Sequence, residues 1–333
     1  MPAQPSVVSL LPSATEIICL LGARDQLLGV SHECDFPAAA CSAGLPQLTA
    51  ARTTLTSSHG AAPSSALIDQ TVRDLVSNAL AIYDLDASAL AALQPDVIIT
   101  QDLCHVCAVS FAAVCSAVDQ LTHKHVNIVS LQPMLLEHVW SDVMRIGAAL
   151  GRHAEAALAV ADLRARVDEL AKRAALQPRA PSVLTIEWLS PVMISGLWLP
   201  ELITLAHATP LVTQPGEHAP TLTRAQLATL DPDVVVIKPC GFKLERTLEE
   251  LPVLRDALPW QQYSAVRAGH VYVADGNAYF NRPGPRLVES LEILAACAHP
   301  GAFSDLRHKH RDSVVRVDSG LARHAFDAPR SPV

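Results

Sequence analysis

The chain has 333 residues, of which 50% are hydrophobic and 17% charged, so it can form about two cores at roughly 150 residues per domain. This composition excludes a disordered chain. Thirty-three acidic against 25 basic residues give a net charge of −8, which disfavours nucleic acid as a partner. The phosphate-binding patterns GxxxxGK[ST] and GxGxxG do not occur.

Membrane and export signals are also missing from the sequence. No apolar run approaches the roughly 20 residues that a membrane-spanning helix needs. The first five residues carry no Lys or Arg, which a secretory signal would have. We therefore expect a cytoplasmic protein whose eight cysteines are reduced. If the sequence is truncated, we expect a periplasmic or membrane-associated protein instead.

The chain opens with a short β-branched run, Ser6–Leu11, which predicts a buried strand. Ser13 and Glu16 then form an S-x-x-E pattern, and this pattern predicts a capping box at the start of a helix. The helix is expected to end at Gly22. A second strand, Leu27–Val30, leads into a polar loop that begins at Ser31.

The remaining elements of the first half follow the same alternation. Residues 38–63 are rich in Ala, Ser, Thr and Pro and predict a long surface loop. Periodic apolar residues and β-branched runs then predict helices at Ala66–Leu80, Ala87–Leu93 (capped by Asp86) and Ser110–Leu121, with strands at Val97–Thr100 and Val126–Leu131.

A helical pattern runs from Leu135 to Leu176, interrupted only by Gly147 and Gly151. Its apolar residues recur at helical spacing with charges between them, which predicts a long amphipathic connector.

The second half repeats the first. Leu90–Ile99 and Leu227–Val236 both read L-A-x-L-x-P-D-V-[IV]-[IV], a short helix, a turn and a buried strand. An internal repeat of this kind predicts two similar α/β lobes with parallel sheets. Asp96 and Asp233 belong to the turns, so we do not read them as paired catalytic acids.

The predicted organisation is therefore an N-terminal α/β lobe (1–134), a connecting long helix (135–177), a C-terminal α/β lobe (178–303) and a loosely ordered tail (304–333). Ligands of open α/β sheets bind beyond the carboxyl ends of the strands, so we expect one site between the lobes.

Five motifs carry a resemblance to a known family. They are Glu33-Cys34-Asp35-Phe36-Pro37, QDLCHVCA from Gln101, EW-x-x-P from Glu187, PCGF from Pro239 and YFNRPGPR from Tyr279. Together with the opening V-x-S-L-x-P-S-A-T-E, they resemble the helical-backbone (class III) substrate-binding proteins of ABC transporters, of the vitamin B12 and iron-siderophore type, in particular a cobalamin-binding-like subgroup.

The resemblance implies a fold and a function. The fold would be α/β, two Rossmann-like lobes with parallel sheets joined by a single long α-helix. The protein would be a non-enzymatic binding protein that holds a small molecule between the lobes, best matched by a corrinoid (cobalamin-like) ligand or another metal chelate. An ABC permease is the implied partner, which the family docks through one Glu per lobe, and we assign no residue here to those two acids.

The candidate ligand contacts come from the matched motifs and from the predicted strand ends. They are Pro12, His32, Glu33, Cys34, Asp35, Gln101, Asp102, Cys104, Glu187, Trp188, Cys240, Phe242, Tyr279, Asn281 and Arg282. B12 binders line their site with several tryptophans, whereas here Trp188 and Tyr279, with Phe280, Phe242 and Phe36, are the aromatic residues expected in it.

Several of these residues have a functional and a structural interpretation. Trp188 either stacks on a flat ligand or belongs to the core. Arg282 either pairs with an anionic group of the ligand or fixes its own loop. Arg286 opens a helix, where the dipole disfavours a cation, so we predict a specific partner for it.

The cysteines raise an alternative function. Cys104, Cys107, Cys240 and His32 are the candidate ligands of a soft metal such as zinc or copper(I), and the alternative is that these thiols only pack loops. A metal- or thiol-dependent enzyme that uses Cys34 and the same groups is therefore the second hypothesis. The remaining Cys19, Cys115 and Cys297 lie on apolar helix faces and are expected in the core.

Overall fold

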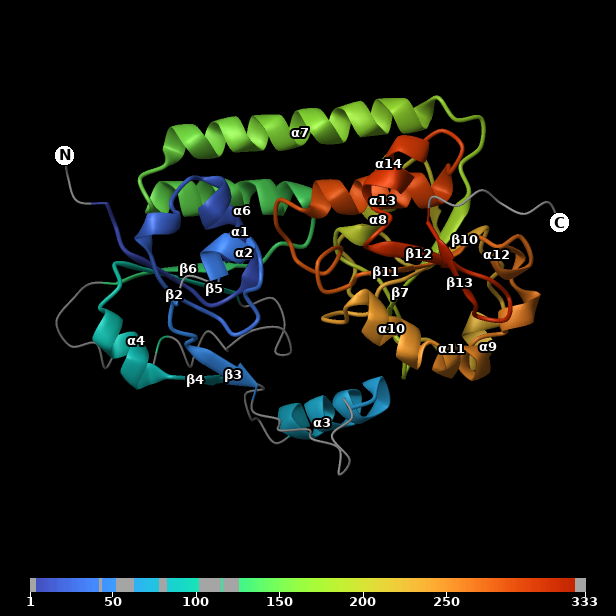
Figure 1. Ribbon diagram of the computed structural model, residues 1–333, viewed down its shortest axis with the longest axis horizontal. Helices are drawn as coiled ribbons and strands as arrows, with labels where there is room; N and C mark the ends of the chain where they lie inside the picture. The colour runs from blue at the N-terminus through green and yellow to red at the C-terminus, as the bar shows by residue number, and fades with distance from the viewer. Residues whose placement is uncertain are drawn as a thin grey trace.

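The computed structural model describes residues 4–41, 44–51, 63–77, 83–101, 115 and 126–326. These form two α/β lobes, and the long helix α7 (His153–Ala175) runs along one side of both (Figure 1). The predicted fold class is confirmed. Among the described residues, no helix is long and apolar enough to cross a membrane.

The first lobe is built on a parallel four-stranded sheet in the order β2-β1-β5-β6. A small antiparallel pair, β3 and β4, lies beside it. The elements of this lobe are β1 (Val7–Ser9), α1 (Pro12–Leu20), β2 (Leu27–Val30), α2 (Ala38–Cys41), β3 (Thr49–Ala51), α3 (Ser65–Ser77), β4 (Tyr83–Leu85), α4 (Ala87–Leu93), β5 (Val97–Gln101) and β6 (Asn127–Leu131).

The second lobe is built on a seven-stranded sheet, in which β9, β7, β10 and β11 are parallel. β8 pairs antiparallel with β7, β12 pairs antiparallel with β11, and β13 pairs antiparallel with β12. Its elements are β7 (Ser182–Trp188), β8 (Met193–Ile194), α8 (Leu199–Leu205), β9 (Thr209–Pro210), α9 (Arg224–Leu227), β10 (Val234–Ile237), α10 (Leu244–Glu250), α11 (Pro252–Ala257), α12 (Ser264–Arg267), β11 (Val271–Ala274), α13 (Leu287–Ala298), α14 (Ser304–Lys309), β12 (Val314–Val317) and β13 (Arg323–Ala325).

The sequence repeat corresponds to equivalent places in the two sheets. β5 pairs in parallel with β1, and β10 pairs in parallel with β7. Asp96 accepts hydrogen bonds from the amide (2.8 Å) and hydroxyl (2.7 Å) of Ser6, and Asp233 does the same for Ser182 at 2.9 Å each. Each aspartate therefore joins its turn to the beginning of the neighbouring strand, which gives both residues a structural role.

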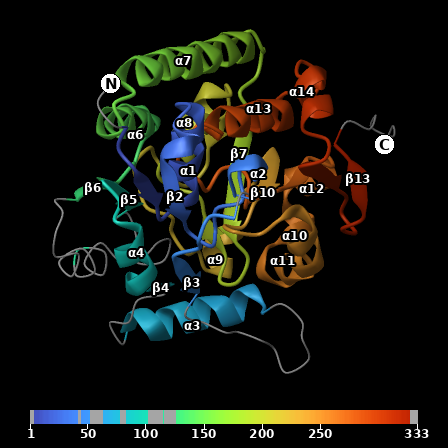
Figure 2. The same cartoon turned by 60° about the vertical axis from the view of Figure 1, so that its left-hand side comes forward.

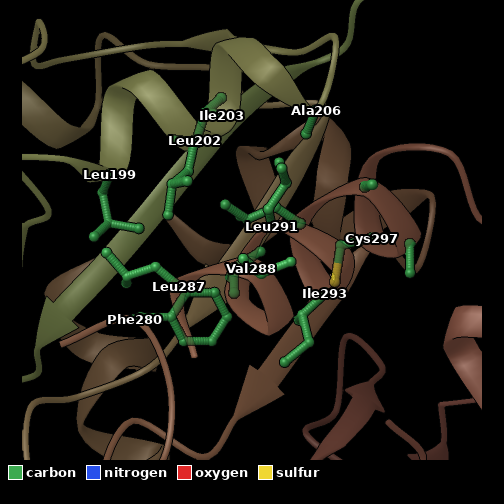
Figure 3. Packing of buried hydrophobic residues seen from close by; sticks show 14 of the residues in the cluster. Leu199, Leu202, Ile203, Ala206, Phe280, Leu287, Val288, Leu291, Ile293 and Cys297 are labelled. Carbon is green, nitrogen blue, oxygen red and sulfur yellow. The ribbon is translucent and has the colours of Figure 1, made fainter. Parts of the chain in front are cut away.

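Apolar residues on both faces of each sheet form the cores. In the second lobe, one core joins α8 and α13 through Leu202, Ile203, Leu287 and Leu291 (Figure 3). Phe280 is fully buried in this core. We had expected it in the site between the lobes, and that expectation is wrong. Burying one such side chain stabilises a fold by about 1.5–3 kcal/mol.

Residues 38–63 are not one surface loop, because they contain α2 and β3 and Leu48 is fully buried. Three further local predictions are wrong. The Ser13–Glu16 capping box does not form, because α1 begins at Pro12 and Glu16 turns towards arginines of the other lobe. The connector is two helices, α6 (Leu136–Ala149) and α7, separated at Gly151, whose φ of +68° ends the first helix.

The third is the tail. Residues 304–326 are ordered into α14, β12 and β13, and β12 pairs with β11 because its valines are buried. Phe326 is fully buried against Tyr272, with 5.6 Å between the ring centres. The run of valines at 314–317 was the sequence signal for this strand.

Candidate functional site

In the second lobe, polar side chains gather where β7 and β10 end. Lys238 directly follows β10 and is fully buried. Its ammonium group donates to Asn281 Oδ1 at 2.8 Å and lies 3.3 Å from Glu187 Oε2. Burial lowers the pKa of Lys238, and the Glu187 carboxylate opposes that effect. The lysine therefore holds Glu187 at the strand ends, where its carboxylate is partly exposed.

The loop that follows β11 is fixed against this group. The Asn281 amide donates to the carbonyls of Lys238 and Gly276 at 3.1 and 2.8 Å. A side chain at Gly276 would lie 2.1 Å from the Pro239 carbonyl oxygen, so only glycine allows the two loops to approach. Asn281 is thus a positioning residue for Lys238.

An aromatic pair lies beside the polar group. The rings of Trp188 and Phe242 are 5.3 Å apart and tilted by 60°. Cys240 lies two residues before Phe242 in the sequence and is exposed, and its backbone amide donates to the Glu187 carbonyl. The end of β7 and the loop after β10 therefore present aromatic, thiol and carboxylate groups together.

The first lobe presents a second aromatic pair after β2. The rings of His32 and Tyr83 are 5.2 Å apart. His32 Nδ1 lies 2.6 Å from Thr49 Oγ1, and Nε2 lies 3.3 Å from the Glu33 carboxylate. The hydrogen bond from His32 lowers the pKa of Glu33, despite burial. Thr49 and Glu33 thus fix the imidazole at the end of the strand.

Four charged side chains join the two lobes, and we call them the arginine clamp: Glu16, Asp35, Arg282 and Arg286. Arg286 donates to both Glu16 oxygens at 2.9 and 2.6 Å, and Arg282 contacts Asp35 at 2.5 Å and Glu16 at 3.6 Å. Burial raises the pKa of Glu16, and the two arginines oppose this. Glu16 is the partner predicted for Arg286, and Arg282 serves to join the lobes.

Several predicted ligand contacts have structural surroundings instead. Cys34 is buried, its sulfur lies 3.1 Å from Thr15 Oγ1, and burial raises its pKa to about 12. Such a thiol is a poor nucleophile or metal ligand. Tyr279 packs against the core that joins α8 and α13. The centre of its ring lies 5.9 Å from that of His310 and 6.5 Å from that of Phe280.

The other predicted residues are less informative. Pro12 is the first residue of α1, and Gln101 is the buried last residue of β5. Asp102, Cys104 and Cys107, and the predicted helix 110–121 apart from Cys115, lie outside the described residues. Within the described ranges, no three His, Cys, Asp or Glu side chains come together as a metal ion would require.

The sequence reasoning missed several residues of this region. Glu16 was assigned to a cap, and Tyr83, Arg246 and Glu250 carried no motif. Lys238 directly precedes the PCGF motif, and a lysine at the end of an apolar strand was the one usable signal for it.

Comparisons with known proteins concern the family and the fold. The family model described as periplasmic binding protein matches residues 7–278. An uncharacterised ABC transporter substrate-binding lipoprotein, YvrC of Bacillus subtilis strain 168, is 21% identical over 305 residues, 90% of this chain and 81% of the relative.

Solved structures share the fold. A periplasmic heme-binding protein from Pseudomonas aeruginosa is 22% identical with a TM-score of 0.66, covering 99% of this chain and all of that one. The periplasmic vitamin B12-binding protein BtuF of Vibrio cholerae is 18% identical with a TM-score of 0.61, covering 89% of this chain and 99% of that one.

These findings overturn one expectation and leave another without support. The expected cytoplasmic location is wrong, because the relatives are periplasmic binding proteins and a substrate-binding lipoprotein. The metal- or thiol-dependent enzyme has no counterpart among the relatives named here, which bind substrates.

Proposed function

Because the chain belongs to the periplasmic binding protein family, within the substrate-binding proteins of ABC transporters, we propose that it holds a metal-containing macrocycle between its lobes. A corrinoid is our first choice. An ABC permease is the recipient that this family membership suggests.

One observation carries the proposal: each lobe has an aromatic pair beside the end of a strand of its main sheet. In the first lobe His32 lies just after β2 and its partner Tyr83 begins β4. In the second lobe Trp188 ends β7 and Phe242 lies in the loop after β10. Aromatic faces stack on flat, polarisable ring systems. Two such pairs on opposite lobes suit the two sides of a macrocycle better than they suit a small polar metabolite.

The charges at this edge favour a corrinoid over a heme. A heme has two free carboxylates, whereas a corrinoid has neutral amides at its edge. Among the described residues, four buried or partly buried cations here are already paired with carboxylates, as Arg286–Glu16, Arg282–Asp35, Lys238–Glu187 and Arg246–Glu250. Glu187 and Glu33 remain as acceptors for amide donors.

The test is to titrate the purified protein with cyanocobalamin, hemin and a ferric siderophore, and to measure binding by calorimetry and by absorption. We expect one cyanocobalamin per chain. Trp188→Ala should weaken its binding about tenfold, from an aromatic contact worth about 1–1.5 kcal/mol, while Trp188→Phe should retain most of the affinity.

Two results would decide against the proposal. Tight binding of hemin with none of cyanocobalamin would make the choice of a corrinoid wrong. Binding of none of the three, by a protein that unfolds cooperatively, would refute the macrocycle.

A further inference from the structure

Helix α3 leaves the first lobe and contacts the second. In the sequence it comes between β3 and β4, two strands that pair with each other in the first lobe. Figures 1 and 2 both show α3 at the opposite side of the molecule from α7. The two lobes are therefore connected on one side by the chain itself and on the other side by the contacts of α3.

The start of α3 is held by charged side chains of α10. The amide and the hydroxyl of Ser65 both donate to Glu250 Oε1 at 2.5 Å. Arg246 donates to the other oxygen of Glu250 at 3.1 Å and to the carbonyl of Pro63. Ser65 is fully buried and Glu250 is 8% exposed, so these are specific, desolvated contacts. Hydrogen bonds to a charged acceptor are stronger than neutral ones.

The same helix start holds the aromatic pair of the second lobe. Trp188 Nε1 donates to the Ser65 carbonyl at 3.2 Å. Ile68 packs against the core that includes Phe242, and the guanidinium of Arg246 lies 5.1 Å above the Phe242 ring. The backbone of α3 therefore sets the orientation of the indole that we assign to the ligand. We call Ser65, Trp188, Arg246 and Glu250 the strap contact.

The length of the connection has no local explanation. β3 and β4 are adjacent antiparallel strands, and a turn of about two residues suffices to join such strands. The chain instead takes residues 52–82 to do so, and places part of them on the other lobe. A purely structural hairpin requires no buried carboxylate on a second lobe to receive it.

We propose that α3 is a strap that fastens the two lobes at the edge where the strands end, and that Ser65 must leave Glu250 for a ligand to enter or depart. This inference rests on the proposed function. It assigns Glu250 and Arg246 as positioning residues, which act on the ligand through α3 and Trp188.

The first arm of the test measures amide hydrogen exchange of residues 63–77 and uses no ligand. Glu250→Gln removes the charge that receives Ser65, and Ser65→Ala removes one donor from the strap side. We expect exchange in α3 to become about tenfold faster, since a charge-assisted hydrogen bond accounts for at least that factor. Glu249→Gln is the matched control, because Glu249 is the exposed neighbour and forms a longer ion pair with the same Arg246, at 3.7 Å.

The second arm measures cyanocobalamin association and dissociation by stopped flow. A strap that must open predicts that Glu250→Gln raises both rates about tenfold, with Kd changed less than threefold, while Glu249→Gln changes neither. Ser65→Ala should shift both rates in the same direction and guards against a folding defect in Glu250→Gln.

Three outcomes would overturn the inference. Unchanged exchange in both variants means that α3 is not held by Glu250. Faster exchange with unchanged rates means that α3 does not control passage. A rise in dissociation alone means that Glu250 belongs to the ligand contacts. If the wild type binds none of the macrocycles, the proposed function and the control of passage fail together, and the exchange arm still decides whether α3 is docked.

Discussion

Two of the contacts between the lobes are built differently. The arginine clamp joins side chains to side chains, and its Glu16 and Arg282 are 2% and 9% exposed. The strap contact joins the backbone at the start of a helix to side chains of the other lobe. Two clamp residues are anchored at the cores, because Glu16 lies on α1 and Arg286 directly precedes α13, whereas α3 lies in a long connection.

This difference indicates which contact can open. Parting the clamp would leave buried charges without partners, which costs several kcal/mol. Parting the strap exposes one carboxylate, which still has Arg246, and the start of a helix, which water can solvate. We therefore expect the clamp to set stability and the strap to set ligand kinetics.

Arg286→Ala should have the largest effect. It removes both hydrogen bonds to the buried Glu16 and leaves Arg282 3.6 Å away as the nearest cation. We expect the free energy of unfolding in urea to fall by about 3 kcal/mol, at the lower end for a broken buried pair. The stability of Arg286→Lys should lie between those of the wild type and Arg286→Ala, because lysine keeps the charge and loses the two-hydrogen-bond geometry of the arginine. A loss below about 1 kcal/mol would show that the clamp does not carry stability.

Asp35→Ala should cost less, because Asp35 is 44% exposed and Arg282 keeps Glu16, Asn277 and the Glu33 carbonyl as partners. About 1–2 kcal/mol is expected for a partly exposed hydrogen bond to a charged group. Urea unfolding beside Arg286→Ala checks the order. A larger loss for Asp35→Ala than for Arg286→Ala would mean that the partly exposed Asp35–Arg282 pair contributes most of the stability of the clamp.

Acid should weaken the contribution of the Asp35–Arg282 pair to stability. Burial raises the pKa of Asp35, but the hydrogen bond and the charge of Arg282 outweigh burial and lower it below 3.8. A carboxylate with a lowered folded-state pKa stabilises the fold above its unfolded pKa and loses that contribution as the pH falls through the folded one. The stability difference between wild type and Asp35→Asn should therefore be full above about pH 4 and shrink below it. A difference that grows in acid would contradict the pairing.

Ser65→Ala should have the smallest effect on global stability. It removes one of two donors to Glu250 and leaves the Ser65 amide and Arg246 in place. We expect a loss of about 1–1.5 kcal/mol in urea unfolding, which corresponds to the tenfold faster exchange expected in α3. A loss as large as that of Arg286→Ala would mean that the strap is part of the cooperative core, and the contrast between the two contacts would not hold.

The sequence predicts the parts of this molecule that local patterns determine. The repeated L-A-x-L-x-P-D-V pattern locates β5 and β10, because a Pro-Asp turn and a β-branched run act over a few residues. Asp86 caps α4 through the Ala89 amide for the same reason.

The parts that depend on distant residues could not be predicted in this way. Glu16 and Arg286 are 270 residues apart, and Ser65 and Glu250 are 185 apart. Within its own segment Glu16 fits a capping box, and only the other lobe explains its role. Arg286 at a helix start was a usable signal because the cation opposes the helix dipole, but it did not identify the partner.

The central claim is that one ligand is held by both lobes at once, and hydrogen exchange of the protein with and without cyanocobalamin tests it most directly. We predict that binding slows exchange together in residues 31–36 of the first lobe and in residues 187–190 and 239–243 of the second, at one ligand per chain. Protection confined to a single lobe, or found only away from these segments, would contradict a site between the lobes.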